Sequence, residues 1–128
     1  MSLKFDRNRK YMVSLFNEDR YLSEECHLAD VFSKRLKGLM FRHSIRDTES
    51  LLIVPCNSIH TFFMNFPIDL VFIDREGNAV ADIREIKPGK VLPTVKGAWA
   101  VLELNGGRLE NIGLKDSIMG SKLVFKAA

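Results

Sequence analysis

The fold class is decided by residues 69–86, which read DLVFIDREGNAVADIREI. Two apolar runs, residues 69–73 and 79–86, flank the turn-forming residues 74–78, Asp-Arg-Glu-Gly-Asn. Runs rich in Val, Ile and Phe on both sides of a short polar connection that contains Gly are typical of a β-hairpin. This segment therefore predicts two antiparallel strands.

Further short apolar runs, separated by turn residues, extend the β pattern over the rest of the chain. Further predicted strands cover residues 11–16, 24–29, 51–54, 58–64, 99–104 and 117–125. The tight connection at 65–68, Asn-Phe-Pro-Ile, predicts that 58–64 pairs with 69–73 as a hairpin, and residues 87–96 form a longer loop. The sequence thus predicts an α+β fold, mostly antiparallel β in a partly closed, barrel-like sheet, with one or two short helices.

The first helix is expected after Asp30, which can cap its N-terminus. Apolar side chains recur there at i, i+4, i+7 and i+8, the spacing of one helix face. These positions are Phe32, Leu36, Leu39 and Met40. Gly38 either ends this helix in a left-handed conformation or lets a neighbouring backbone come close. A second short helix is predicted at 107–112, before Gly113.

The composition is that of an ordinary globular protein. The chain has 128 residues, of which 46% are hydrophobic and 27% charged, a formal net charge of +3, and no repeat or Gly/Ser-rich linker. These values exclude collagen-like, disordered and coiled-coil classes, and the length suits a single domain over residues 1–128. The mild, scattered positive charge makes no case for a nucleic-acid partner.

The N-terminal residues carry the densest basic patch. We expect residues 1–10 to form a flexible, solvated arm, and residues 1–3 resemble a remnant of an expression vector. The longest apolar run, 98–102, is far shorter than the roughly 20 residues that span a bilayer, so no membrane span is expected. Without an apolar leader the chain as it stands predicts a cytoplasmic protein, or an exported one if a signal peptide was removed.

Cys26 and Cys56 are too few for a disulfide framework, and they are compatible with two free thiols or one bridge. Cys26 shares a strand face with Leu28, whereas Glu25 and His27 take the other face, so Cys26 is predicted to lie in the core.

Most of the chemically active groups lie in residues 55–69, which read PCNSIHTFFMNFPID. Together with the preceding RLKGLMFR at 35–42 and the following VLELNGG at 101–107, this segment resembles the uncharacterised family called domain of unknown function 192. The resemblance runs from about residue 28 to residue 124. It implies a compact β-rich domain with short helices and no established reaction, cofactor or partner. Residues 116–117, Asp-Ser, depart from the family's usual Gly-Asp turn.

Cys56 and His60 are the candidate catalytic pair, with Cys56 as nucleophile and His60 as base. If residues 58–64 form a strand, Cys56 lies in the turn before it. The Cys56 thiol then reaches the His60 imidazole only if that turn folds back. In the predicted hairpin Asp69 would lie about 13 Å along the strand from His60, at about 3.3 Å per residue, which is too far to orient the imidazole. Glu103 or a backbone carbonyl would have to take that role.

The candidate ligand-binding residues are Arg35, Arg42, Thr61 and Glu103, each of which brings a polar group into apolar surroundings. The alternatives are structural. One of the two arginines can pair with Asp69 or Glu103, Glu103 can face solvent or be buried with a partner, and His60 can be a core histidine.

Asp69 and Asn65 are expected to be structural polar residues, and Asp69, which lies beside Asn65 and Pro67, can accept backbone N–H groups of the 65–68 connection.

No resident metal is expected, and the sequence leaves the cofactor unknown. A three-ligand site from His43, Cys56 and His60 is conceivable by residue type alone. Residues 105–107, Asn-Gly-Gly, lack the Lys-Ser/Thr of a phosphate-binding loop, and the aromatic residues are not interleaved with cations as on a nucleic-acid platform.

Three function classes remain open. The leading interpretation is a domain that binds a small polar or anionic ligand at the His, Cys, Arg and Glu cluster. The second is an enzyme that uses Cys56 and His60. The third is a structural or protein-interaction module with an exposed apolar patch and no pocket. The sequence leaves the oligomeric state open.

Overall fold

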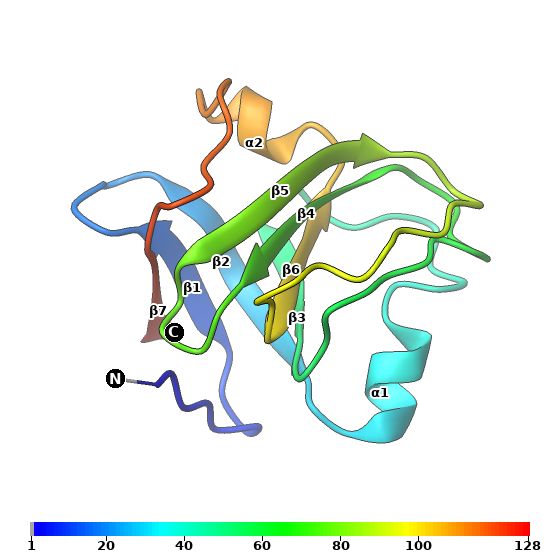
Figure 1. The fold of residues 1–128 in the computed structure, drawn as a ribbon, viewed down its shortest axis with the longest axis horizontal. Helices are drawn as coiled ribbons and strands as arrows, with labels where there is room; N and C mark the ends of the chain where they lie inside the picture. The colour runs from blue at the N-terminus through cyan, green and yellow to red at the C-terminus, as the bar shows by residue number, and fades with distance from the viewer. Residues whose placement is uncertain (1) are drawn as a thin grey trace.

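The computed structural model describes residues 2–128, apart from the Phe32 side chain. The chain forms one curled seven-stranded sheet with two short helices (Figure 1). The strands are β1 (Tyr11–Leu15), β2 (Tyr21–Ala29), β3 (Glu49–Ile53), β4 (Ile68–Ile73), β5 (Ala79–Ile86), β6 (Ala100–Asn105) and β7 (Leu123–Ala127). The helices are α1 (Phe32–Lys37) and α2 (Arg108–Asn111). Neither helix is long enough to cross a membrane, and the described residues contain no other.

The sheet has the strand order β5-β4-β6-β3-β2-β1-β7 and is antiparallel except where β2 pairs with β3. Its two outer strands meet at one end. The N–H of Leu123 donates to the carbonyl of Gly77, and the N–H of Ala79 donates to the carbonyl of Ser121. These bonds join the start of β5 to the start of β7 and close the sheet in part. The predicted fold class, a mostly antiparallel, partly closed sheet with two short helices, is confirmed.

The β4–β5 hairpin forms where residues 69–86 predict it. In its turn the Asp74 carboxylate accepts hydrogen bonds from the N–H groups of Glu76 and Asn78. Gly77 has a φ of +91°, and a Cβ there would lie 3.0 Å from the Leu123 carbonyl oxygen. The turn therefore requires glycine, both for its backbone conformation and for its contact with β7.

The strand predicted at 58–64 is wrong. This segment is an irregular loop whose backbone bonds to the 87–96 loop: the N–H of Thr61 donates to Lys90, and the N–H of Leu92 donates to Ile59. Phe63 has a positive φ of 63°, which lies outside the range of regular β-strands. The predicted 58–64/69–73 hairpin is therefore wrong too, because β4 pairs with β5 and β6. Residues 117–122, predicted as strand, are also turns that lead into β7.

Helix α1 is shorter than its apolar spacing predicts. Its N-cap is Val31 rather than Asp30, and it ends at Lys37, because Gly38 takes a φ of +48°. Leu39 is buried, but Leu36 is 59% exposed, so the predicted apolar face is only partly correct. Helix α2 lies within the predicted 107–112, and Gly113, at a φ of +90°, follows it.

The sheet separates two apolar cores. The first packs beside α2, and representative members are Val13, Leu22, Cys26, Leu102 and Leu109. The second packs under the 55–66 loop and the residues that follow α1, and representative members are Leu39, Ile53, Met64, Leu70 and Val101. Side chains alternate between these cores along β6, so Val101 enters the second core whereas Leu102 and Leu104 enter the first. Glu103 therefore points toward the second core.

The N-terminal segment lies against the first core. The N–H of Leu3 donates to the Arg75 carbonyl, and the Phe5 ring contacts the rings of Tyr11, Trp99 and Phe125. These contacts give residues 2–5 a fixed position in the structure. The flexibility of residues 1–10 and the single-domain organisation stay predictions, and Met1 lies outside the described residues.

Asp69 is fully buried and accepts three backbone hydrogen bonds, from the N–H groups of Glu85, Gly107 and Leu109. These donors belong to β5 and to the start of α2, not to the 65–68 connection from which they were expected. Asp69 therefore joins α2 to the β4–β5 hairpin.

We expect Asp69→Ala to lower the free energy of unfolding by about 3 kcal/mol, because three buried N–H groups lose a charged acceptor. Urea denaturation measures this loss. The matched control is Asp116→Ala at an exposed position, for which a change within about 0.5 kcal/mol is expected. Equal effects of the two substitutions would contradict the role of Asp69.

Candidate functional site

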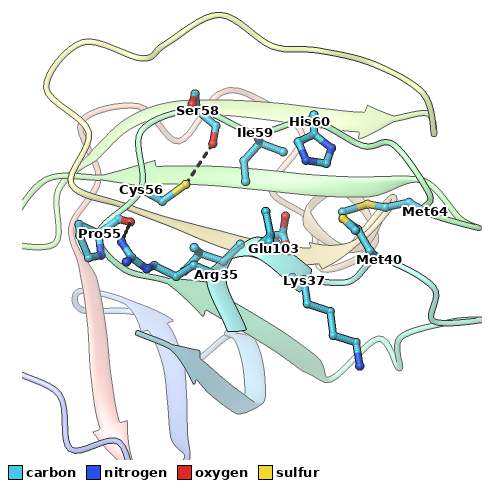
Figure 2. Close-up of a pocket in the computed structure, with 13 residues that line it drawn as sticks. Arg35, Lys37, Met40, Pro55, Cys56, Ser58, Ile59, His60, Met64 and Glu103 are labelled. Atoms are coloured by element: carbon cyan, nitrogen blue, oxygen red, sulfur yellow. Dashed lines mark hydrogen bonds between the residues drawn. The ribbon is translucent and has the colours of Figure 1, made fainter. Parts of the chain in front are cut away.

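A cavity of about 420 Å³ opens between α1, the loop over 55–64 and β6. Figure 2 shows Glu103 between the α1 side chains and the loop that carries Cys56, Ser58, Ile59 and His60. The polar residues that line the cavity are Arg35, Lys37, Cys56, Ser58, His60 and Glu103. Three chain segments that are distant in the sequence thus meet at one concave surface.

Glu103 is the most unusual group in this cavity. It is 1% exposed, and its cross-strand neighbours on β3 and β4 are Leu51 and Leu70. Among the residues that the structure describes, neither carboxyl oxygen has a hydrogen-bond partner. Burial raises the pKa of Glu103 to about 8, so the carboxyl is mostly protonated and uncharged at neutral pH.

The end of α1 leaves room for this carboxyl. A Cβ at Gly38 would lie 3.5 Å from Oε1 of Glu103 and 3.6 Å from the Ile53 side chain. The sequence allowed Gly38 either to end the helix or to permit a close approach. Its positive φ of 48° at the end of α1 supports the first role, whereas a Cβ there would make only ordinary van der Waals contacts with Glu103 and Ile53.

Arg35 reaches the cavity from α1. One terminal nitrogen, Nη1, donates to the Pro55 carbonyl at 3.4 Å, whereas Nε is buried without a partner. In the part of the chain that the structure describes, Arg35 makes no ion pair with Glu103 or Asp69, the carboxylates expected to bind it. Arg35 and Glu103 therefore both line the cavity, and each has a buried polar group without a hydrogen-bond partner among the described residues.

Cys56 and His60 both line the cavity but do not form a hydrogen-bonded pair among the described residues. The Cys56 thiol donates to the Ser58 carbonyl at 3.1 Å. Burial, together with the Glu103 charge, raises the pKa of the Cys56 thiol against the opposing effects of Ser58 and Arg35. This direction is opposite to that of an activated nucleophile.

His60 has a defined tautomer when it is neutral. Its Nδ1 accepts a hydrogen bond from the N–H of Phe62 at 3.3 Å, so the single ring proton is carried by Nε2. Neutral His60 can therefore act as a hydrogen-bond donor through Nε2.

Two of the expected ligand-binding residues do not line the cavity. Arg42 instead binds Glu49 at 3.3 Å, because α1 ends before it and Arg35 and Arg42 do not share a helix face. The buried Thr61 hydroxyl donates to the Lys87 carbonyl and accepts from the N–H of Lys90. The Arg42 guanidinium and the Thr61 hydroxyl therefore both bind other groups of the fold.

Asn65 has a similar structural contact, since its Nδ2 donates to the Arg42 carbonyl at 2.8 Å. This bond ties the 65–68 connection to the segment after α1. The Asn65 side chain thus makes a contact within the fold and does not line the cavity.

Sequence reasoning missed several lining residues, among them Lys37, Met40, Ser58 and Met64. Lys37 and Met40 flank Gly38 within the RLKGLMFR motif, which is the signal that could have indicated them. Met64 was not identified as a residue of the cavity, because residues 58–64 were predicted to form a strand.

Both cysteines are free thiols. Cys26 lies in the first core as expected, and burial raises the pKa of its thiol to about 12. Within residues 2–128 the structure brings together no group of three or more His, Cys, Asp or Glu side chains that could hold a metal ion.

A family model described as "Uncharacterized ACR", domain of unknown function 192, matches residues 13–123. The chain belongs to this family. Among curated members, the UPF0127 protein of Pyrococcus horikoshii is 34% identical over 110 residues, which cover 81% of this chain and 89% of that protein. The UPF0127 protein of Pyrococcus abyssi is 31% identical over 102 residues, which cover 72% of this chain and 82% of that protein.

Two solved structures share the fold of this family member. A protein of Sinorhizobium meliloti 1021, named "putative transcription regulator", superposes with a TM-score of 0.77 at 23% identity, over 91% of this chain and 93% of that one. A protein of unknown function from Novosphingobium aromaticivorans superposes with a TM-score of 0.74 at 24% identity, over 88% and 83% of the two chains. At these identities the likeness shows the fold alone.

We expect alkylation of Cys56 by iodoacetamide to follow a pH profile with its midpoint above the ordinary thiol value of about 8.5, because burial disfavours the thiolate. Peptide mass spectrometry separates Cys56 from the buried Cys26. Glu103→Gln should lower the midpoint, because it removes a negative charge that raises the thiol pKa. A midpoint below about 8.5 in the unmodified chain would instead indicate an activated nucleophile.

Proposed function

We propose that this family member binds a small polar or anionic molecule in the cavity lined by Arg35, Cys56, His60 and Glu103. The observation that carries the proposal is the buried Glu103 carboxyl, whose two oxygens have no hydrogen-bond partner. A ligand that completes these hydrogen bonds would explain why a carboxyl group occupies this position.

A buried polar group without a hydrogen-bond partner lowers the stability of a folded protein. Nearly all buried side-chain polar atoms in proteins are hydrogen-bonded, and an unmade bond costs about 1–3 kcal/mol. Leu51 and Leu70 flank Glu103 across the sheet, so a leucine there would continue an apolar face. The acid therefore costs stability in the unliganded chain, and a bound molecule can offset that cost.

The composition of the cavity supports the same conclusion. Small-molecule sites are concave and mostly apolar, with a few convergent polar groups that fix the orientation of the ligand. Here Arg35 and His60 reach the cavity from α1 and from the loop, and Glu103 reaches it from the sheet.

The two other function classes receive less support. Catalysis by Cys56 and His60 would need a thiol with a lowered pKa, whereas burial raises it. An interaction module fits the stacked Phe41 and Phe63 rings, which are 63% and 65% exposed. That interpretation also predicts a surface without a pocket, and the cavity is present.

The test is an NMR titration of the ¹⁵N-labelled chain with three probes of similar size: butyrate, butyramide and butylammonium. We expect at least one probe to shift the amide signals of Gly38, Ile59 and Glu103, because these residues line the cavity. Ile59→Trp fills the cavity and should abolish the shifts. Val91→Trp, at an exposed position next to His60 in the β-bridge, is the matched control and should retain them.

Two results would overturn the proposal. One is the absence of shifts at these residues with all three probes. The other is equal binding by the chain with Ile59→Trp and the chain with Val91→Trp, which would place the bound probe outside the cavity.

A further inference from the structure

We infer that the cavity selects a small monocarboxylate with an apolar body, and that its carboxylate group binds between Glu103 and Arg35. This inference rests on the proposed function and names the class of ligand. It follows from the hydrogen-bonding character of the lining groups and from the apolar walls.

The lining groups offer donors to a ligand. Among the described residues, Arg35 has a buried N–H at Nε without an acceptor, whereas the Lys37 side chain extends away from Glu103 (Figure 2). Neutral His60 carries its ring proton on Nε2, because Nδ1 accepts from Phe62. The Cys56 thiol already donates to Ser58. A ligand with an anionic acceptor complements this set of groups.

Glu103 fits this set when it is protonated, because a carboxylic acid donates its O–H to a carboxylate and forms a short, charge-assisted hydrogen bond. Its cross-strand neighbours on β3 and β4, Leu51 and Leu70, carry no charge. The other titratable groups that line the cavity are Arg35, Lys37, Cys56 and His60. Burial raises the pKa of Glu103 to about 8, so the donor form predominates at neutral pH.

The walls require an apolar body. The apolar lining residues are Leu36, Met40, Ile53, Pro55, Ile59 and Met64. An inorganic anion such as phosphate would leave these surfaces uncovered, whereas an alkyl group buries them at about 25 cal/mol per Å². An alkylammonium ion would need ionised Glu103 and would lie beside the Arg35 cation.

The experiment measures dissociation constants for butyrate, butyramide, butylammonium and inorganic phosphate by NMR, from pH of about 6.5 to about 9.5. We expect butyrate to bind about tenfold more tightly than each other probe at the lowest pH. Its affinity should fall about tenfold per pH unit above pH of about 8, because only protonated Glu103 donates to it.

Three variants identify the groups responsible. Glu103→Gln should bind butyrate without the loss at high pH, because the amide donates an N–H at every pH. Cys56→Ser should keep the loss, which excludes thiol ionisation as its cause. Arg35→Met, which removes a side-chain donor from the short helix α1, should weaken butyrate binding about tenfold or more.

The outcomes separate this inference from the proposed function. If butylammonium, butyramide or phosphate binds at the cavity more tightly than butyrate at the lowest pH, or if butyrate affinity is constant over the pH range, the carboxylate inference is wrong while cavity binding stands. The inference is also wrong if Glu103→Gln keeps the loss at high pH. If no probe binds at the cavity, both proposals fail.

Discussion

The site depends on one unfavourable arrangement, the burial of the Glu103 carboxyl in an apolar sheet face without a hydrogen-bond partner. An ionised carboxylate in such surroundings is costly enough that the group keeps its proton instead. The strand alternation of β6 puts Glu103 on this face, and Gly38, at the end of α1, lies beside it. The cavity lies where these two features meet.

Asp69 is a second buried acid in the same fold, and its role is structural. Asp69 and Glu103 lie on the neighbouring strands β4 and β6, and both are almost fully buried. In the β-ladder Asp69 pairs with Leu104 and Leu70 pairs with Glu103, so the two acids point to opposite faces of the sheet. Asp69 accepts three backbone N–H groups at the α2 face, whereas Glu103 accepts none at the α1 face. This contrast marks Glu103 as the buried acid whose hydrogen-bonding capacity is unused by the described residues.

The sequence predicted the features that local chemistry determines. Runs rich in Val, Ile and Phe on both sides of the 74–78 turn were sufficient to predict the β4–β5 hairpin. The 58–64 segment was mispredicted because its aromatic and β-branched residues favour a strand, while tertiary hydrogen bonds to 87–92 hold it as a loop. The partner of Arg42, Glu49, could not be predicted because it depends on where α1 ends.

The most direct test of this account is the pKa of Glu103, measured from the chemical shift of its side-chain carboxyl carbon as a function of pH. Comparison with Glu103→Gln assigns the signal. The account predicts titration near pH of about 8, because the buried carboxyl has neither a charge partner nor a hydrogen-bond donor. Titration near the ordinary glutamate value of about 4.3 would show that the carboxyl is solvated or paired, and would contradict the central claim.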